Sequence, residues 1–384
     1  MIHQTSQAAS SILCLGMGWF PQTPGGLNRY AYELIQALTP QNHVEYCGIG
    51  LPKQQTSPGL HFTNLADDNV PLPLRLHMAQ KNFAQRQLQQ PDVINLHFAL
   101  YSFPILHQLP SNVPVVFNFH GPWALESQQE GASRLNVGIK YWLEQQVFRR
   151  CDRFIVLSKA FGEILHTHYN ISWNKIHIIP GGVDINRFQA NLSRQQAREI
   201  LNWPLDRFIL FTPRRLVHRM GLSILLDAIA QIQSECPDVW LAIAGKGNLS
   251  LALEQQAAEL DINNHVQFLG FLPDELLPIA YQAADLTILP SQSLEGFGLV
   301  LVESLACGTP VVCTPIGGMP EVISGLSPEL ITRTAEAESI ATMLADVIHG
   351  VIKLPSRNTC RTYADTYFNW SNIAQKVRDV LLTI

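Results

Sequence analysis

Several signatures of specialised proteins are missing from this 384-residue sequence. The seven cysteines are scattered and odd in number, and no CxxC pair or Cys/His cluster occurs, so we expect a reducing compartment and no structural zinc. No apolar run reaches the ~20 residues that a membrane-spanning helix needs. No Lys or Arg precedes the first apolar run, which argues against a signal peptide. Residues Ile12 to Gly16 are therefore predicted to form a buried first strand.

The common catalytic motifs are also absent. The sequence has no GxxxxGK[ST] loop, no HExxH, no GxSxG and no Asp-x-Asp pair, which argues against a P-loop enzyme, a zinc peptidase, a serine hydrolase and metal dependence. Two glycine-rich stretches only resemble a dinucleotide fingerprint, because Pro21 and Ser250 stand where its third glycine belongs. A nicotinamide dehydrogenase is disfavoured, and no cofactor is expected.

The charge balance excludes one class of partner and leaves another open. The net charge is −5, and only 15% of residues are charged, so a dedicated nucleic-acid binder is not expected. The stretch 75–87 (RLHMAQKNFAQRQ) is basic and has a helical pattern. It suits either a solvated helix face or peripheral contact with an anionic membrane.

Short apolar runs alternate with longer helical patterns along the whole chain. The predicted strands are 11–16, 93–98, 113–120, 153–158, 176–182, 208–214, 239–247, 266–271, 286–291 and 309–314. The predicted helices are 26–38, 134–151, 160–168, 221–235, 249–260, 273–284 and 297–308. This alternation is typical of parallel sheets covered by helices, and it restarts once, so we predict two doubly wound α/β domains. The boundary is expected near the stretch PGGVDINRFQANLS.

Two features of the first half stand at predicted strand ends, where such sheets bind ligands. Gly25 and Gly26 precede a helix, and their amides suit an anion at its N-terminus, although a tight connecting turn would explain the same glycines. His120 follows a strand and is followed by Gly-Pro. It is either a functional group at the site or a structural histidine whose ring nitrogens are hydrogen-bonded within the fold.

The second half has a cluster of cations in a strand-to-helix loop. Arg214, Arg215 and Arg219 stand within six residues. One guanidinium group can bind two phosphate oxygens at once, so the cluster suits a diphosphate. The alternative is that the three arginines form salt bridges on the surface.

Two glutamates occur in the otherwise apolar stretch SQSLEGFGLVLVESLACGTPVV. Glu303 lies where a core helix would carry leucine, and carboxylates are rarely buried without partners. A carboxylate there can accept hydrogen bonds from a vicinal diol such as a ribose, each worth ~1.5–3 kcal/mol. Glu295 can reach a sugar hydroxyl, and the amides of Gly296, Phe297 and Gly298 can face an anion. Anion, diol and sugar hydroxyl together indicate a nucleotide sugar.

Taken together, these motifs resemble the family 4 retaining glycosyltransferases of the GT-B fold. The similarity extends from PGGLNRYAYEL through FIVLSKAF, IHIIPGGVDINRF, RRLVHRMG and AGKG to DLTILPSQSLEGFGLVLVESLACGTPVVCTPIGGMPEVI, which contains the family's E-x7-E spacing. The resemblance implies two Rossmann-like domains that face each other across a cleft. Residues 1–185, joined by the last helix at about 367–384, would form the acceptor-side domain. Residues 186–366 would bind the nucleotide sugar.

The resemblance also implies roles for individual residues. Glu303 would hold the ribose, Glu295 the donor sugar, and Arg215 the diphosphate, which Gly26 would approach from the first domain. His120 would lie over the donor sugar near the reacting carbon. The amides of Phe297, Gly298 and Leu299 would lie near the sugar and diphosphate, and Gly245, Leu269, Gly270 and Leu272 would line the base pocket.

One position departs from the family pattern. The family's diphosphate loop usually reads Arg-Leu-Val-x-x-Lys-Gly, and Met220 occupies the lysine position here. We expect Arg219, helped by Arg214, to supply the missing charge. Loss of one such donor costs ~3–4 kcal/mol of transition-state stabilisation.

The resulting hypothesis is a retaining glycosyltransferase. It would move a hexose, with glucose as the first candidate, from a UDP-sugar to an acceptor hydroxyl of a carbohydrate or a lipid-linked sugar in polysaccharide or glycoconjugate synthesis. The expected location is the cytoplasm, including the inner face of the membrane. The alternatives are a nucleotide-sugar epimerase of the same fold and a non-catalytic nucleotide-sugar-binding protein.

Overall fold

The computed structural model describes residues 9–53, 57–86, 90–189 and 191–383. The chain divides into two compact units. The first comprises residues 1–125, 133–182 and 370–384, and the second comprises residues 126–132 and 183–369. The expected boundaries, at 185/186 and 366/367, lie three residues from the observed changes of unit at 182/183 and 369/370. The sequence did not indicate that 126–132 would group with the second unit. The predictions for residues 1–8 and for Gln87 lie outside the described residues.

The first unit contains a parallel sheet of seven strands, in the order β3-β2-β1-β4-β5-β6-β7. The strands are β1 Ser10–Leu15, β2 Asn42–Ile49, β3 Leu60–Ala66, β4 Val93–Leu96, β5 Val115–Phe119, β6 Arg153–Val156 and β7 Ile176–Ile178. The direction of winding reverses between β1 and β4. The carboxyl ends of these strands are therefore where a doubly wound sheet binds its ligand.

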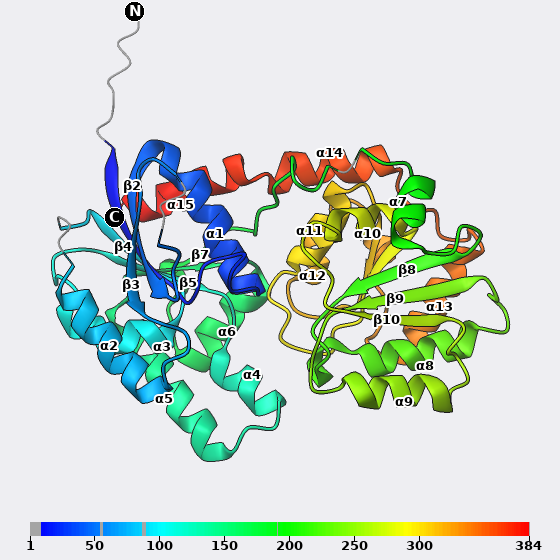
Figure 1. Cartoon of the computed structure of the whole chain (residues 1–384), viewed down its shortest axis with the longest axis horizontal. Helices are drawn as coiled ribbons and strands as arrows, with labels where there is room; N and C mark the ends of the chain where they lie inside the picture. Colours follow the sequence, from blue (N-terminus) through cyan, green and yellow to red (C-terminus); the bar gives the residue numbers. More distant parts are fainter. Residues whose placement is uncertain (1–8, 54–56, 87–89, 190, 384) are drawn as a thin grey trace, which may run out of the picture. The chain divides into compact units, whose positions relative to one another are not determined.

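Helices cover this sheet (Figure 1). They are α1 Gly26–Leu38, α2 Leu72–Ala84, α3 Ala99–Ser102, α5 Arg134–Arg150, α6 Lys159–Tyr169 and α15 Trp370–Leu382, with the 3₁₀ turns η1 Thr39–Gln41, η2 Phe103–Gln108 and η3 Trp173–Lys175. Helix α4, Trp123–Gln129, spans the first change of unit. Helices α1 and α15 pack together, while α2 and α5 both pack on η2.

Two strands of this sheet, β2 and β3, were missed by the sequence analysis. The reason is visible at Glu45, a charged residue within β2 that is nearly buried. Its carboxylate accepts a hydrogen bond from Thr63 Oγ1 at 2.7 Å and lies 3.4 Å from Arg86 Nε. Both partners lie outside β2. The sequence around Glu45 therefore looks too polar for a buried strand, although β2 is buried.

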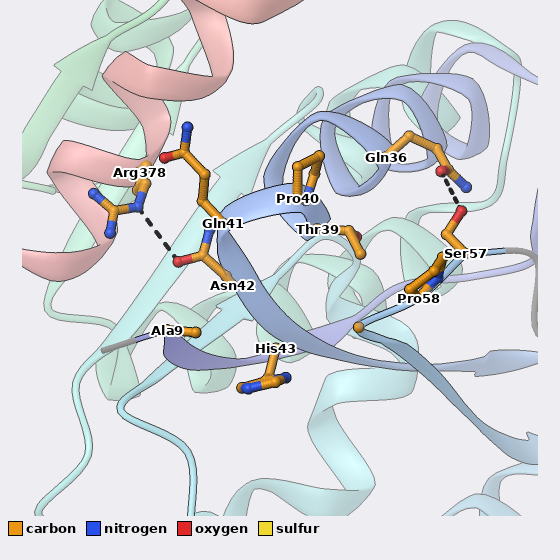
Figure 2. Close-up of a pocket in the computed structure, with 11 residues that line it drawn as sticks. Ala9, Gln36, Thr39, Pro40, Gln41, Asn42, His43, Ser57, Pro58 and Arg378 are labelled. Atoms are coloured by element: carbon orange, nitrogen blue, oxygen red, sulfur yellow. Dashed lines mark hydrogen bonds between the residues drawn. The ribbon is translucent and has the colours of Figure 1, made fainter. Parts of the chain in front are cut away.

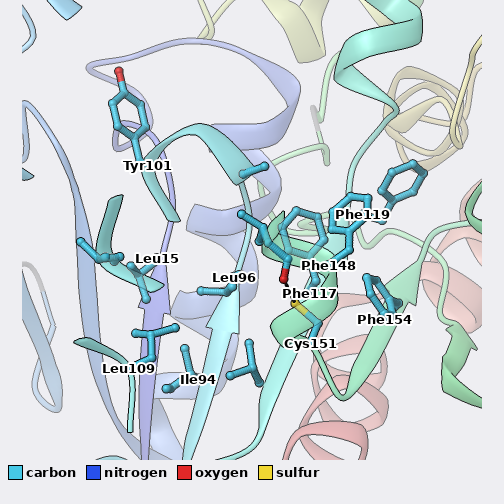
Figure 3. Close-up of a cluster of buried hydrophobic side chains, with 14 of the residues drawn as sticks. Leu15, Ile94, Leu96, Tyr101, Leu109, Phe117, Phe119, Phe148, Cys151 and Phe154 are labelled. Carbon is cyan, nitrogen blue, oxygen red and sulfur yellow. Dashed lines mark hydrogen bonds between the residues drawn. The ribbon is translucent and has the colours of Figure 1, made fainter. Parts of the chain in front are cut away.

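The hydrophobic core of the first unit is rich in aromatic rings (Figure 3). Phe148 of α5 lies edge-on to Phe117 of β5 and to Phe154 of β6, with ring centroids 4.9 and 5.5 Å apart. Leu15 and Leu96 extend the same cluster to β1 and β4. Burial of these side chains holds the strands in register and so positions the loops at their carboxyl ends.

The second unit contains a parallel sheet of five strands, in the order β10-β9-β8-β11-β12, and confirms the prediction of a second doubly wound domain. Its strands are β8 Phe208–Pro213, β9 Val239–Ala244, β10 Val266–Gly270, β11 Leu286–Leu289 and β12 Val311–Cys313. Its helices are α7 Arg194–Leu201, α8 Leu222–Ile232, α9 Ser250–Glu259, α10 Leu277–Ala283, α11 Leu299–Ala306, α12 Met319–Ile323, α13 Ala337–Ile348 and α14 Arg357–Phe368, with η4 His218–Met220 and η5 Pro328–Leu330. Helices α8, α9 and α13 cover one face, and α7, α10, α11 and α14 cover the other (Figure 1). Here the winding reverses between β8 and β11.

The chain returns to the first unit at Trp370, the first residue of α15. The indole is buried, and its ring centroid lies 5.2 Å from that of Tyr30 on α1. Its Nε1 donates a hydrogen bond to Glu33, also on α1. A Cβ added at Gly182 would lie 2.4 Å from the indole, so the last residue before 183–369 must lack a side chain.

Candidate active site

Residues Gly25 and Gly26 stand at the start of α1. Gly25 has φ 136°, which favours glycine, and it precedes the first helical residue, Gly26. A Cβ on either glycine would meet nothing within 4 Å, so steric crowding does not explain both. The helix has no side-chain cap hydrogen bond among the described residues. Its first amides are thus suited to an anion.

His120 lies directly after β5 and belongs to a chain of polar side chains. Its Nε2 lies 3.1 Å from Nδ1 of His97, which follows β4. The ring of Tyr30 stands edge-on to His120, with centroids 4.8 Å apart. Burial lowers the pKa of His120 to about 3, so the imidazole is neutral at physiological pH. It can offer one donor and one acceptor, but no charge.

Arg214 and Glu295 meet where the second sheet reverses its winding. Arg214 follows β8, and Glu295 lies in the loop between β11 and α11. The guanidinium forms an ion pair with the Glu295 carboxylate, and its Nη2 donates to Ser291 Oγ at 2.6 Å. Burial acts to raise the pKa of Glu295, but the adjacent Arg214 and Arg219 outweigh it and hold the pKa below its usual value. The carboxylate is therefore ionised and oriented.

Two glycines fix the backbone of Glu295. Gly318 N–H donates to the Glu295 carbonyl at 2.9 Å. A Cβ on Gly317, which has φ 60°, would lie 1.9 Å from the same oxygen. The glycine pair in PIGGMPE lies within the family's motif, and no role was predicted for it from the sequence.

Glu303 is buried, with only 5% of its surface exposed. It occupies the fifth position of α11, and its Oε2 accepts a hydrogen bond from the phenol of Tyr281 at 2.8 Å. Tyr281 comes from α10 and is itself fully buried. A carboxylate has about four lone-pair sites, so it can accept hydrogen bonds from more than one donor. Sequence reasoning missed Tyr281, because only the packing of α10 on α11 brings it there.

The backbone leading into α11 carries the predicted amides. Gly298 is the N-cap residue with φ 81°, and Leu299 is the first helical residue. Phe297 is buried, with its ring centroid 5.7 Å from that of Phe368. Gly296 is also buried. Because α11 has no side-chain cap among the described residues, its first amides can face an anion.

The three arginines of the 214–219 cluster have different environments. Arg215 is the exposed one, with 58% of its side chain accessible, and its Nη2 lies 4.0 Å from Glu130. Arg219 is buried, and its Nη1 donates to the Leu294 carbonyl at 3.2 Å. Its guanidinium also lies 3.4 Å from Glu126 and 3.5 Å from Glu130. Two carboxylates of 126–132 thus already offset the charge that was expected to replace the lysine.

Met220 is buried at 6% exposure, so the family's lysine position here faces the protein interior. Burial raises the pKa of Glu126 more than the neighbouring Arg219 lowers it. Because Arg214 and Arg219 are buried, Arg215 offers the most accessible positive charge of the three arginines.

The residues expected at the base pocket come together at the ends of β9 and β10. Gly245 N–H donates to the Gly270 carbonyl at 2.6 Å, and a Cβ at Gly245 would lie 1.9 Å from the Arg214 carbonyl. Leu269 and Leu272 are half-buried. Phe271 between them is 57% exposed and presents an aromatic ring beside the predicted pocket.

A cavity of about 850 Å³ lies elsewhere, against the first sheet (Figure 2). It is lined by Ala9, Gln36, Thr39, Pro40, Gln41, Asn42, His43, Ser57, Pro58, Gly59 and Arg378. Asn42 and His43 begin β2, and Arg378 Nε donates to Asn42 Oδ1 at 3.3 Å. The cavity is thus at the amino ends of the strands, the edge opposite to the ligand-binding edge of such sheets.

Two properties of the described residues concern membranes and metal ions. No helix among them is both long and apolar enough to cross a bilayer. The described part of the chain also lacks any group of three or more His, Cys, Asp or Glu side chains placed to hold a metal ion.

Comparisons with known proteins agree along most of the chain. The family described as "Glycosyltransferase Family 4" matches residues 24–187, and the family described as "Glycosyl transferases group 1" matches residues 193–367. An uncharacterised glycosyltransferase of Methanocaldococcus jannaschii is 30% identical over 94% of this chain and 95% of its own. A D-inositol 3-phosphate glycosyltransferase of Streptomyces scabiei is 27% identical over 93% of this chain and 86% of its own.

Solved structures share the fold. Sucrose-phosphate synthase of Thermosynechococcus elongatus has a TM-score of 0.80 at 23% identity, covering 97% of this chain and 98% of its own. Anabaena HepE in complex with UDP and glucose has a TM-score of 0.75 at 21% identity, covering 98% of this chain and all of its own.

Proposed function

The chain belongs to the group 1 glycosyltransferases of family 4, with the GT-B fold, and we propose that it transfers a hexose from a UDP-sugar to an acceptor hydroxyl with retention of anomeric configuration. The observation that carries the proposal is the oriented, ionised Glu295, held by Arg214 beside the N-terminus of α11 at the reversal of the second sheet. Glu303 lies on α11 itself, about one turn after the first residue of that helix. Diphosphate, sugar and ribose each have a matching group there.

Relatives support the choice of donor. Anabaena HepE has been solved with UDP and with UDP-glucose, which makes UDP-glucose the first donor to test. The exposed ring of Phe271, beside Gly245 and Gly270, suits a planar base.

In the proposed mechanism the leaving group also acts as the base. The bond between the anomeric carbon and the diphosphate oxygen breaks, and the acceptor oxygen bonds to the same face of the sugar. The acceptor's proton passes to the departing diphosphate. Arg215 and the amides at the start of α11 stabilise the charge that develops there. No metal or other cofactor enters this proposal.

The neutral His120 has a donor role in this scheme. Because its pKa is lowered to about 3, it does not protonate the leaving group at neutral pH. We assign it instead to a hydrogen bond with the donor sugar near the reacting carbon.

The acceptor and the cellular setting are proposed more broadly. Curated relatives are named for inositol 3-phosphate, and a solved neighbour is named for lipopolysaccharide biosynthesis. We propose a carbohydrate or lipid-linked sugar acceptor in polysaccharide or glycoconjugate synthesis. All seven cysteines are free and buried, which suits the reducing cytoplasm.

The test is slow donor hydrolysis without acceptor, across UDP-, GDP- and ADP-sugars, with the product anomer followed by NMR. We expect one UDP-hexose to be cleaved and the free sugar to appear first in the donor's own anomeric form. Release of the opposite anomer would contradict retention. Preferred cleavage of a GDP- or ADP-sugar would contradict the UDP assignment.

A non-catalytic nucleotide-sugar-binding protein is the second candidate. It is favoured by the environment of Arg219, whose charge faces Glu126 and Glu130 while Met220 occupies the lysine position. Tight donor binding, with neither hydrolysis nor transfer to any tested acceptor, would support it.

A further inference from the structure

Helix α5 carries an apolar stripe on its exposed side. Leu135, Ile139 and Trp142 are 76%, 51% and 52% exposed. Their spacings of four and three residues put them on one face of the helix. The opposite side of α5 is buried in the core through Val147 and Phe148. Large apolar side chains that line up on a surface mark an interaction site.

The charged side chains that α5 exposes have one sign. Of its four basic residues, Arg134 and Arg149 are exposed, whereas Lys140 lies over the Trp123 ring and Arg150 donates to the carbonyls of Pro110 and Val113. Its one acidic residue, Glu144, is buried, and its carboxylate accepts from the backbone N–H of Trp123 and from the phenol of Tyr169. The solvent side of the helix is therefore apolar and cationic without an acid of its own.

Helix α2 adds to the same character. It packs on η2, as α5 does, and exposes Leu72 and Leu74 at 44% and 52%. It has no acid, and its charged residues are the exposed Lys81 and Arg75, whose guanidinium donates to the carbonyls of Asp68 and Val70.

We propose that the exposed face of α5, with the start of α2, docks on an anionic lipid surface. Leucine, isoleucine and tryptophan side chains enter the boundary between headgroups and acyl chains, while lysine and arginine meet the anionic headgroups. The charge pattern of α5 argues for lipid rather than for an apolar protein groove, because its exposed charges are Arg134 and Arg149 and its one acid is buried. The proposed membrane contact is thus made mainly by the stripe on α5 and not by the basic stretch 75–87.

Co-sedimentation with vesicles tests this surface on the full chain. We expect binding to phosphatidylglycerol-containing vesicles, little binding to phosphatidylcholine vesicles, and weakening by salt. Replacing Leu135→Ser and Ile139→Ser together should weaken binding by about tenfold or more. Leu251→Ser is the matched control, since Leu251 is 81% exposed on α9 of the second unit.

Three results would overturn the proposal. They are no binding to either vesicle, equal binding by the Leu135/Ile139 variant and the wild type, and a wild-type dimer that this variant turns into a monomer. The last would assign the face to self-association. Vesicle binding needs no glycosyl transfer, so the donor-hydrolysis test remains independent of it.

A second observation concerns the polar chain that ends at His120. Asn118 donates to Asn95 Oδ1, so the amide of Asn95 is left to donate to His97 Nε2, 3.1 Å away. Since His97 Nε2 accepts, its proton is on Nδ1, which donates to His120 Nε2 at 3.1 Å. The proton of neutral His120 is then on Nδ1.

We infer that His97 is a positioning residue that holds His120 in the Nδ1–H tautomer. His97 is buried at 1% exposure and its ring stacks on that of His120, so it acts through His120 and not on a substrate. The catalytic part of this inference rests on the proposed role of His120 at the donor sugar. The tautomer itself does not.

Nitrogen-15 NMR of labelled histidine reads the tautomer directly. We expect His120 to show a protonated Nδ1 and an unprotonated Nε2 at pH 7 in the wild type. A His120 protonated at Nε2 would overturn the inference whether or not the protein is active.

Variants at His97 then test the consequence. His97→Asn keeps an N–H near the Nδ1 position, whereas His97→Leu removes it. We expect His97→Leu to lower kcat about tenfold, the value of one hydrogen bond, with little change in donor KM, and His97→Asn to recover most of the loss. His107→Gln, at an exposed histidine of η2, is the control. Equal losses in both His97 variants would indicate a structural role and overturn the assignment.

Discussion

At the scale of single residues, the buried Glu303 inside the otherwise apolar helix α11 has a specific consequence. Glu303→Gln keeps the size of the side chain but replaces the charged acceptor, so we expect donor KM to rise about 10- to 100-fold with a smaller change in kcat. Initial-rate kinetics with varied donor measures it. Glu254→Gln on α9, at an exposed position, is the control. An unchanged KM would contradict the ribose assignment.

His120 makes a prediction about stability. Its pKa is about 3 in the folded protein against 6.5 for an unperturbed histidine, so only the unfolded state takes up this proton as the pH falls below 6.5. The contribution of neutral His120 is thus complete above pH 6.5 and is lost progressively toward pH 3, by about 1.4 kcal/mol for each pH unit.

Urea unfolding at pH 7 and pH 5 measures this effect. We expect His120→Gln to lose about 2 kcal/mol less stability than the wild type between the two pH values, because glutamine does not titrate. Parallel losses in the two proteins would show that His120 is not buried in its neutral form.

At the scale of elements, the loop before α12 is expected to control the position of Glu295. Gly317→Ala would add a Cβ 1.9 Å from the Glu295 carbonyl, whereas Gly350→Ala meets nothing within 4 Å at a similar φ of 73°. Both variants have the strain of a left-handed alanine, about 1 kcal/mol.

Only Gly317→Ala should displace the catalytic loop. We therefore expect a sharp fall in donor turnover and a further loss of unfolding free energy for Gly317→Ala, and unchanged turnover for Gly350→Ala. Equal behaviour of the two variants in turnover and thermal unfolding would show that the contact is not tight.

At the scale of the whole molecule, the chain leaves the first unit at residue 182 and returns to it at Trp370. Trp370→Ala removes a buried indole that lies against Tyr30 and Gly182, and we expect it to cost about 3–5 kcal/mol of unfolding free energy. Because Tyr30 also contacts His120, donor turnover should fall as well. Urea unfolding measures the loss, with the exposed Tyr367→Ala as control. A loss below 1 kcal/mol would mean that α15 is not part of the first unit's core.

The sequence predicted much of this molecule because its signals are local. Strand and helix alternation, glycines at strand ends and the spacing of Glu295 and Glu303 all depend on neighbours along the chain. Helix α1 begins and ends at the predicted residues 26 and 38. Strand β2 was not predicted, because the partners that neutralise Glu45 come from β3 and from Arg86 and are not visible in the local sequence.

The fold class, the division into two doubly wound units and the family were thus determined by the sequence alone. Only the tertiary structure decided which side chains form ion pairs and hydrogen bonds with one another. It paired Arg214 with Glu295, placed Tyr281 on Glu303, turned Arg219 toward Glu126 and linked His97 to His120. The physical reason is that ion pairs and hydrogen bonds join residues that are distant in sequence, and helix packing and sheet order bring those residues within reach.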